Sequence, residues 1–215
     1  MTRFLVVFDV DSTLIKDEVI ELLADAAGKR EEVAAITESA MRGELDFASS
    51  LHERVATLRD LPESVLQDAY SKIRVTDGAI ELIDAVHRAG GKVAAVSGGF
   101  DQILKPLAQR LDLDFYRANL LGVENARLTG KVVGPVVDRS AKAQALSEWC
   151  QALGLKVIHS LAIGDGANDL DMMKLSGLSV AFNAKPQVRQ SADLVVAGDS
   201  LAALIPVIGV ANTTE

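Results

Sequence analysis

Short apolar runs bounded by glycine or polar residues recur along this chain of 215 residues, and they constrain its fold more than any other feature. The clearest runs are Phe4–Phe8, Val93–Val96, Val157–Ile163, Leu178–Phe182 and Leu194–Val196. These runs are continuous rather than alternating, which is typical of parallel strands covered by helices on both faces. Helical patterns lie between them, such as Asp77–Ala89 and Ser140–Leu153. The sequence therefore predicts an α/β fold with a doubly wound, mainly parallel, Rossmann-like sheet.

One long segment, Lys16–Arg74, interrupts this alternation of strands and helices. Only helical patterns occur in it, at Asp17–Ala27, Arg30–Arg42, Asp46–Leu58 and Pro62–Ile73. We expect residues 16–74 to form a helical-bundle cap inserted into an α/β core made of residues 1–15 and 75–215. A second irregular stretch, Phe115–Val137, contains the short β-like runs Asn119–Val123 and Lys131–Val133 and predicts a small β-hairpin.

Composition excludes several classes of function. The 30 acidic residues outnumber the 22 basic residues, and the net charge of −8 disfavours nucleic acid and anionic membranes as partners. Cys150 is the only cysteine, which rules out an intrachain disulfide and a cysteine-based zinc site. No apolar run approaches the ~20 residues needed to span a bilayer, and no signal-peptide pattern is visible. We therefore expect a cytoplasmic protein; the oligomeric state stays open between monomer and homodimer.

Two aspartates, Asp9 and Asp11, follow the first predicted strand. Ligands of open α/β sheets bind beyond the carboxyl ends of the strands, and residues two apart on an extended backbone point the same way. Two carboxylates at this range repel, so we expect one to hold a proton or both to share a cation. This suits a nucleophile beside a general acid/base, although a strand-end turn uses the same residue types.

Two further strand ends carry residues suited to a phosphate and a metal ion. Ser97-Gly98-Gly99 follows one strand, where a hydroxyl and two glycines let backbone N–H groups approach an anion; a plain turn has the same composition. Gly164-Asp165-Gly166-Ala167-Asn168-Asp169 follows another strand and has the carboxylates that Mg²⁺ prefers. Because these strand ends meet at one edge of the sheet, we expect them to form a single site.

Together with Lys142, these segments resemble, in order and spacing, the four motifs of the haloacid dehalogenase superfamily of phosphatases. The resemblance extends over nearly the whole chain, cap included, and is strongest to the branch of that family that hydrolyses O-phosphoserine. It implies that Asp9 is the nucleophile that forms an aspartyl-phosphate and that Asp11 is the general acid/base. It also implies that Mg²⁺ is held by Asp9, Asp165 and the backbone carbonyl of Asp11.

The same resemblance assigns the groups around the phosphate. It implies that the phosphoryl oxygens are held by Ser97, Gly98, Gly99 and Lys142, with Asn168 nearby. Asp169 would orient Lys142 and support the metal ligands. These assignments agree with the electrostatics of phosphoryl transfer, since a carboxylate approaches a phosphate dianion only where positive charge screens the repulsion.

The cap residues bear on the substrate. Arg54 lies beside an apolar stripe that contains Phe47 and Leu51, where its guanidinium could bind a carboxylate through two hydrogen bonds. Glu18 begins the first cap helix and could pair with an ammonium group. A surface arginine and a first-turn acid are equally compatible with these positions. By resemblance, Glu18 and Arg54 match residues that bind the amino and carboxylate groups of a phosphorylated amino acid.

Two apolar cap residues, Met41 and Phe47, match by resemblance the residues that close over the substrate; packing within the cap is an alternative for Met41. The leading hypothesis is therefore an Mg²⁺-dependent hydrolase acting on O-phosphoserine, in the last step of serine biosynthesis. One alternative keeps the site but changes the substrate or the acceptor, for example phosphothreonine or another hydroxyl. The other is a phospho-acceptor signalling module, which the acid pair after the first strand and the following cap disfavour.

Overall fold

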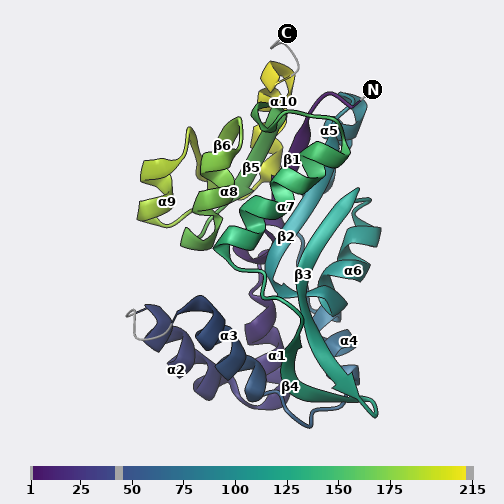
Figure 1. Cartoon of the computed structure of the whole chain (residues 1–215), viewed down its shortest axis with the longest axis vertical. Helices are drawn as coiled ribbons and strands as arrows, with labels where there is room; N and C mark the ends of the chain where they lie inside the picture. Colours follow the sequence, from purple (N-terminus) through teal and green to yellow (C-terminus); the bar gives the residue numbers. More distant parts are fainter. Residues whose placement is uncertain (1, 42–45, 212–215) are drawn as a thin grey trace.

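The computed structural model describes residues 2–41 and 46–211, and within them seven strands form one sheet in the order β4-β3-β2-β1-β5-β6-β7. The strands are β1 (Leu5–Phe8), β2 (Lys92–Phe100), β3 (Phe115–Glu124), β4 (Arg127–Val133), β5 (Ser160–Gly164), β6 (Leu178–Phe182) and β7 (Leu194–Val196). All neighbouring pairs are parallel except β3 and β4. The predicted α/β fold with a mainly parallel sheet is confirmed (Figure 1).

The helices lie between the strands, apart from four consecutive helices that follow β1. They are α1 (Val19–Ala27), α2 (Arg30–Met41), α3 (Phe47–Ala56), α4 (Ser64–Ser71), α5 (Ala79–Arg88), α6 (Asp101–Arg110), α7 (Arg139–Ala152), α8 (Leu170–Leu175), α9 (Pro186–Ser191) and α10 (Ile205–Ala211). Short turns add η1 (Val10–Leu14), η2 (Val157–His159), η3 (Ala167–Asp169) and η4 (Leu201–Leu204). No helix among the described residues is long and apolar enough to cross a membrane.

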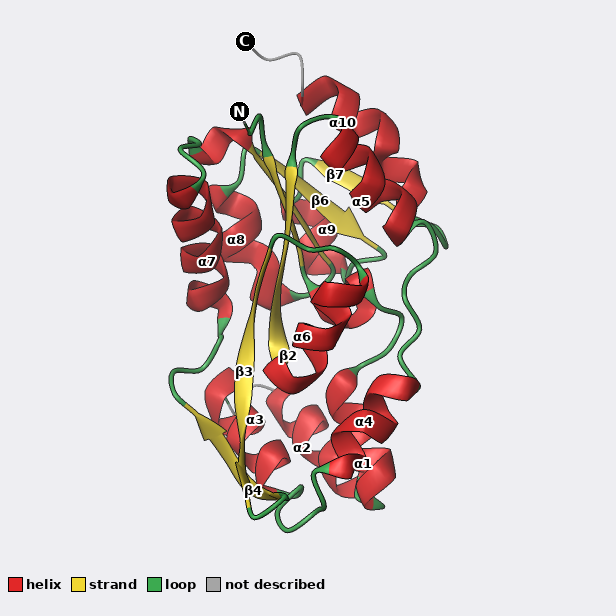
Figure 2. Ribbon diagram, turned by 90° about the vertical axis from the view of Figure 1, so that its right-hand side faces the viewer, coloured by secondary structure: helices red, strands yellow, loops and turns green. Residues whose placement is uncertain are grey.

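Both faces of the sheet are buried, and the alternation along β1 shows how. Val6 and Phe8 join the hydrophobic cluster that contains α5, α6 and the cap helices. Leu5 and Val7 point the other way, into the cluster formed with α7, α8 and α9. All four side chains are fully buried, which explains why β1 reads as a continuous apolar run. Figure 2 shows helices on both sides of the twisted sheet.

The segments before α1 and after α4 lie side by side where the helices α1 to α4 connect to the sheet. Ile15 and Val75 form an antiparallel bridge, and the Lys16 N–H donates to the Arg74 carbonyl at 2.8 Å. Arg74 also donates from its guanidinium to Asp17 at 2.6 and 3.0 Å. The buried side chains of these helices belong to the same hydrophobic cluster as one face of the sheet. The division into an α/β core and a helical cap at residues 16–74 therefore stays a prediction.

The predicted small hairpin is part of the main sheet. β3 pairs with β2 in parallel before it pairs with β4. Both strands of the hairpin are therefore longer than the predicted runs Asn119–Val123 and Lys131–Val133. The start of β4 contacts the cap: Leu128 exchanges backbone hydrogen bonds of 2.9 Å with Asp60 and Leu61. The run Val157–Ile163 also differs, because its first three residues form the short helical turn η2 and Ile158 is exposed.

Candidate active site

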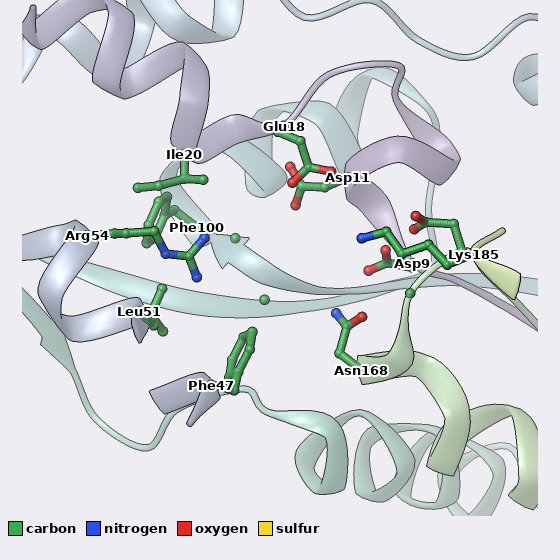
Figure 3. A pocket seen from close by; sticks show the side chains of 14 residues that line it. Asp9, Asp11, Glu18, Ile20, Phe47, Leu51, Arg54, Phe100, Asn168 and Lys185 are labelled. Atoms are coloured by element: carbon green, nitrogen blue, oxygen red, sulfur yellow. The ribbon is translucent and has the colours of Figure 1, made fainter. Parts of the chain in front are cut away.

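A cavity of about 140 Å³ lies beyond the carboxyl ends of β1, β2 and β5, where the order of the strands reverses direction around β1 (Figure 3). This is the place at which open α/β sheets bind ligands. The cavity is lined by Asp9, Asp11, Glu18, Ile20, Phe47, Leu51, Arg54, Gly98, Gly99, Phe100, Asp165, Gly166, Asn168 and Lys185. The predicted strand-end residues and the predicted cap residues Glu18, Phe47 and Arg54 therefore meet at one place.

Lys142 contacts Asp9, which lines this cavity, and has no exposed surface. Asp138 caps α7 by accepting the Ala141 N–H at 2.8 Å, which places Lys142 in the first turn of the helix. The Lys142 ammonium donates to Asp9 and, at 2.7 Å, to Asp169. Burial alone would lower the pKa of Lys142, but the charges of Asp169 and Asp9 outweigh it and raise the pKa above its usual value. Lys142 is thus a permanent cation held between two carboxylates.

Asp9, Asp165 and Asp169 form a cluster in which one oxygen of each lies within 4.8 Å of the others. Burial raises the pKa of Asp9 well above its usual value, and repulsion from Asp169 adds to the effect. Burial, and then Asp169, also raise the pKa of Asp165 to about 6. One ammonium is too little positive charge for three such carboxylates, and hard divalent cations prefer oxygen ligands. The cluster therefore fits a divalent cation.

Asp169 is oriented by groups on both of its oxygens. One accepts from Lys142, and the other accepts the Gly166 N–H at 3.0 Å. A β-carbon at Gly164 would lie 2.5 Å from Asp169 Oδ2, so only glycine leaves room for this carboxylate. This geometry agrees with the predicted role of Asp169 in orienting Lys142.

Asp11 is held by two donors at the entrance of the cavity. It accepts the Val19 N–H at 2.7 Å and the Ser97 hydroxyl at 3.1 Å. The Ser97 oxygen in turn accepts the Gly99 N–H at 2.7 Å. Burial, followed by the charge of Glu18, raises the pKa of Asp11 to about 7, although both donors favour the ionised form. Near neutral pH this carboxyl can therefore both give and take a proton.

The cap closes one side of the cavity with charged and apolar groups. Glu18 accepts the Ser12 hydroxyl at 2.6 Å, and Arg54 donates from Nε to the Ser50 carbonyl at 3.2 Å. Burial lowers the pKa of Arg54, while Glu18 and Asp11 oppose the change. Phe47 lies against Gly98, where an added β-carbon would be 2.9 Å from the ring. The side chain of Met41 lies outside the described part of the chain, so its predicted role stays a prediction.

Sequence reasoning missed several lining residues, of which Lys185 is the only charged one among those described. Lys185 follows the carboxyl end of β6, so the strand-end argument that found Asp165 could have found it too. Ile20 and Phe100 were missed because nothing in their apolar patterns distinguishes lining a cavity from filling the core. Thr13 donates to Asp165 at 3.4 Å, a contact between residues far apart in the sequence.

Comparison with known proteins finds relatives that cover nearly the whole chain. The model of the haloacid dehalogenase-like hydrolase family matches residues 6–174. The phosphoserine phosphatase SerB2 of Mycobacterium tuberculosis is 49% identical over 97% of this chain, and the phosphoserine phosphatase of Streptococcus thermophilus is 47% identical over 95% of each chain. A solved substrate-bound phosphoserine phosphatase complex superposes with a TM-score of 0.90 at 39% identity, covering 96% of this chain and 99% of the other.

The relatives differ in length. The chain spans about half of the Mycobacterium tuberculosis protein, 51% of its length, and nearly all of the Streptococcus thermophilus protein. The regions shared with these two relatives cover 97% and 95% of this chain. The chain belongs to the haloacid dehalogenase-like hydrolase family, in the group of that family that contains these phosphoserine phosphatases.

Proposed function

We propose that this chain hydrolyses O-phospho-L-serine to L-serine and phosphate with Mg²⁺ as its cofactor, which is the last step of serine biosynthesis. One observation carries the proposal. A single cavity is lined by Asp9, which is paired with Lys142, and by Asp11, whose pKa suits proton exchange. The acid Glu18 and the base Arg54 line the cap side of the same cavity. The names of the similar proteins support the substrate, and the carboxylate cluster supports the cation.

In the first step, an oxygen of Asp9 attacks phosphorus, and the bond between phosphorus and the serine oxygen breaks. Asp11 gives its proton to that oxygen, so L-serine leaves as a neutral alcohol and Asp9 carries the phosphoryl group. In the second step, the ionised Asp11 takes a proton from water, whose oxygen attacks phosphorus and frees Asp9. A pKa of about 7 suits Asp11 to both tasks near neutral pH.

The phosphoryl oxygens need positive partners in both steps. Lys142, held against Asp9, brings a cation to the attacking carboxylate, and the Ser97 hydroxyl is fixed by the Gly99 N–H. We expect Ser97, the backbone at Gly98 and Asn168 to complete the phosphate site. When bound, Mg²⁺ would be held by Asp9, Asp165 and the Asp11 carbonyl and would draw charge from the phosphoryl oxygens.

The cap residues account for the rest of the substrate. Glu18 and Arg54 line the same cavity with opposite charges, which matches the ammonium and carboxylate groups of an amino acid. Arg54 is half-buried, and the negative charges of Glu18 and Asp11 favour its protonated form, against the effect of burial on its pKa. A guanidinium in this partly desolvated place binds a carboxylate more strongly than one in water.

Replacing Arg54 with alanine should lower kcat/KM for O-phosphoserine by about 100-fold, because hydrogen bonds to charged groups contribute ~1.5–3 kcal/mol each. Hydrolysis of O-phosphoethanolamine, which has the ammonium group but no carboxylate, should fall by less than about threefold. Phosphate release from both esters measures the difference. Arg59→Ala, which removes an exposed arginine near the end of the same helix, is the matched control. Equal losses on both esters in Arg54→Ala would contradict the carboxylate assignment.

A further inference from the structure

Lys185 places an ammonium group in the cavity from the side opposite Arg54 (Figure 3). It is the residue before α9, and its backbone N–H donates to the Asp165 carbonyl at 3.0 Å. Its neighbours Ala184 and Val188 are buried, so the backbone at this point is held firmly against the end of β5. The side chain itself is exposed and lies along the cavity towards Asp9 and Asp11.

The three cationic side chains at the cavity, Lys142, Arg54 and Lys185, differ in their hydrogen-bond and ion-pair partners. Lys142 is bound by Asp9 and Asp169, and Arg54 donates to the Ser50 carbonyl. Lys185, in contrast, makes no side-chain hydrogen bond or ion pair with the residues that the structure describes. Burial and the charge of Asp169 raise the pKa of Asp165, and the positive charge of Lys185 is close enough to lower it in part. A free ammonium beside carboxylates is available for an anionic ligand.

The charge balance of the site shows why such a cation matters. Among the described residues, the acidic groups at the cavity are Asp9, Asp11, Glu18, Asp165 and Asp169, and the basic groups are Lys142, Arg54 and Lys185. With all of these groups ionised, a divalent cation brings the formal charge of the set to zero, whereas without Lys185 it would be −1. Protonation of Asp11, which the first step requires, adds one positive charge to either sum, so Lys185 makes the site one unit more positive in both states. A phosphate dianion enters a neutral site more readily than a negative one.

We propose that Lys185 is a phosphate-binding residue, which holds the phosphoryl group of substrate and product from the β6 side of the cavity while Lys142 holds it from its place beside Asp9. Position favours the phosphoryl group over the substrate carboxylate, since Lys185 lies towards Asp9 and Arg54 lies at the opposite end. The proposal rests on the proposed function for the identity of the substrate, but not for the binding of inorganic phosphate.

The position of Lys185 has a second consequence. An ammonium beside Asp165 repels a metal ion bound to the same carboxylate, so this side chain should weaken Mg²⁺ binding while it strengthens phosphate binding. The two effects have opposite signs. A residue that only supported the loop after β6 would change both affinities in the same direction, because a displaced loop disturbs Asp165 as well as the cavity.

The test compares Lys185→Met, which keeps the length of the side chain and removes the charge, with Lys185→Arg and with the wild-type protein. Calorimetric titration of the phosphate-free protein gives the Kd for Mg²⁺, and inhibition by inorganic phosphate at saturating Mg²⁺ gives the Ki. In Lys185→Met we expect Mg²⁺ to bind about threefold more tightly and phosphate about tenfold more weakly. Lys185→Arg should keep the phosphate Ki within about threefold of the wild-type value.

Lys156→Met is the matched control, because Lys156 is also an exposed lysine directly before a short helical turn but lies at the amino end of β5. An unchanged phosphate Ki in Lys185→Met would overturn the proposal, as would a parallel loss of Mg²⁺ and phosphate affinity. If the wild-type protein binds phosphate but does not hydrolyse O-phosphoserine, the proposed function is refuted instead. The phosphate affinities of the wild type and of Lys185→Met, measured calorimetrically, would then still decide the role of Lys185.

Discussion

Asp9→Asn should lower kcat for O-phosphoserine by roughly 10³-fold or more, since an amide oxygen cannot form the covalent phosphoryl intermediate. The protein should remain as stable as the wild type, because the substitution keeps the shape of the side chain and removes one of several neighbouring negative charges. Asp169 still pairs with Lys142 in the variant. Phosphate release measures activity, and chemical denaturation measures the free energy of unfolding.

Mass spectrometry of acid-quenched reactions adds a direct readout for this variant. The wild-type protein should carry one added phosphoryl group on the peptide that contains Asp9, and Asp9→Asn should carry none. Asp84→Asn is the matched control, because Asp84 is an exposed aspartate on α5 and lies outside the cavity. Turnover in Asp9→Asn comparable to that of the wild type would eliminate Asp9 as the nucleophile.

Lys142→Met should damage both stability and activity. It leaves Asp9 and Asp169 buried without their shared ammonium, and breaking a buried ion pair costs about 3–5 kcal/mol. The loss of stability should shrink as the pH falls, since burial already raises the pKa of Asp9 and the protonated carboxyl no longer needs a positive partner. Denaturation of the metal-free protein at pH 5 and pH 8 measures this difference.

A second variant separates the role of Lys142 in stability from its role in activity. Lys142→Met combined with Asp169→Asn removes one of the two uncompensated charges and should recover part of the lost free energy of unfolding. Phosphate release should stay at least about 100-fold below the wild-type rate in both variants, because a cation beside the attacking carboxylate is missing. A stable double variant with wild-type turnover would show that Lys142 acts only in folding.

The amino-acid sequence was sufficient to predict the fold class and to predict that the candidate catalytic side chains lie close together. Buried parallel strands such as β1 are continuous apolar runs, and the residues after them must meet at one edge of the sheet. This is why Asp9, Ser97 and Asp165 could be placed together from their positions in the sequence alone. Their catalytic and metal-binding roles, in contrast, rest on the resemblance to the family and stay predictions.

Other features could not be read from the sequence because they depend on contacts between distant segments. β3 extends beyond its apolar run because it pairs with β2 and then with β4. In the sequence Glu18 does not differ from an ordinary first-turn acid, and only the fold places it beside Ser12 and the cavity. Lys185 is one exposed lysine among many until the end of β6 places it next to Asp165.

The most direct test of the proposed function is phosphate release by the wild-type protein from O-phosphoserine, O-phosphothreonine, O-phosphoethanolamine and a simple alkyl phosphate. Each ester is assayed with Mg²⁺, then with a chelator, and again after Mg²⁺ is restored. We expect O-phosphoserine to have the highest kcat/KM, by at least about tenfold over the esters that lack the carboxylate, and the activity to vanish and return with the metal. Equal rates on all four esters, or full activity in the presence of the chelator, would contradict a Mg²⁺-dependent phosphatase that recognises both ends of phosphoserine.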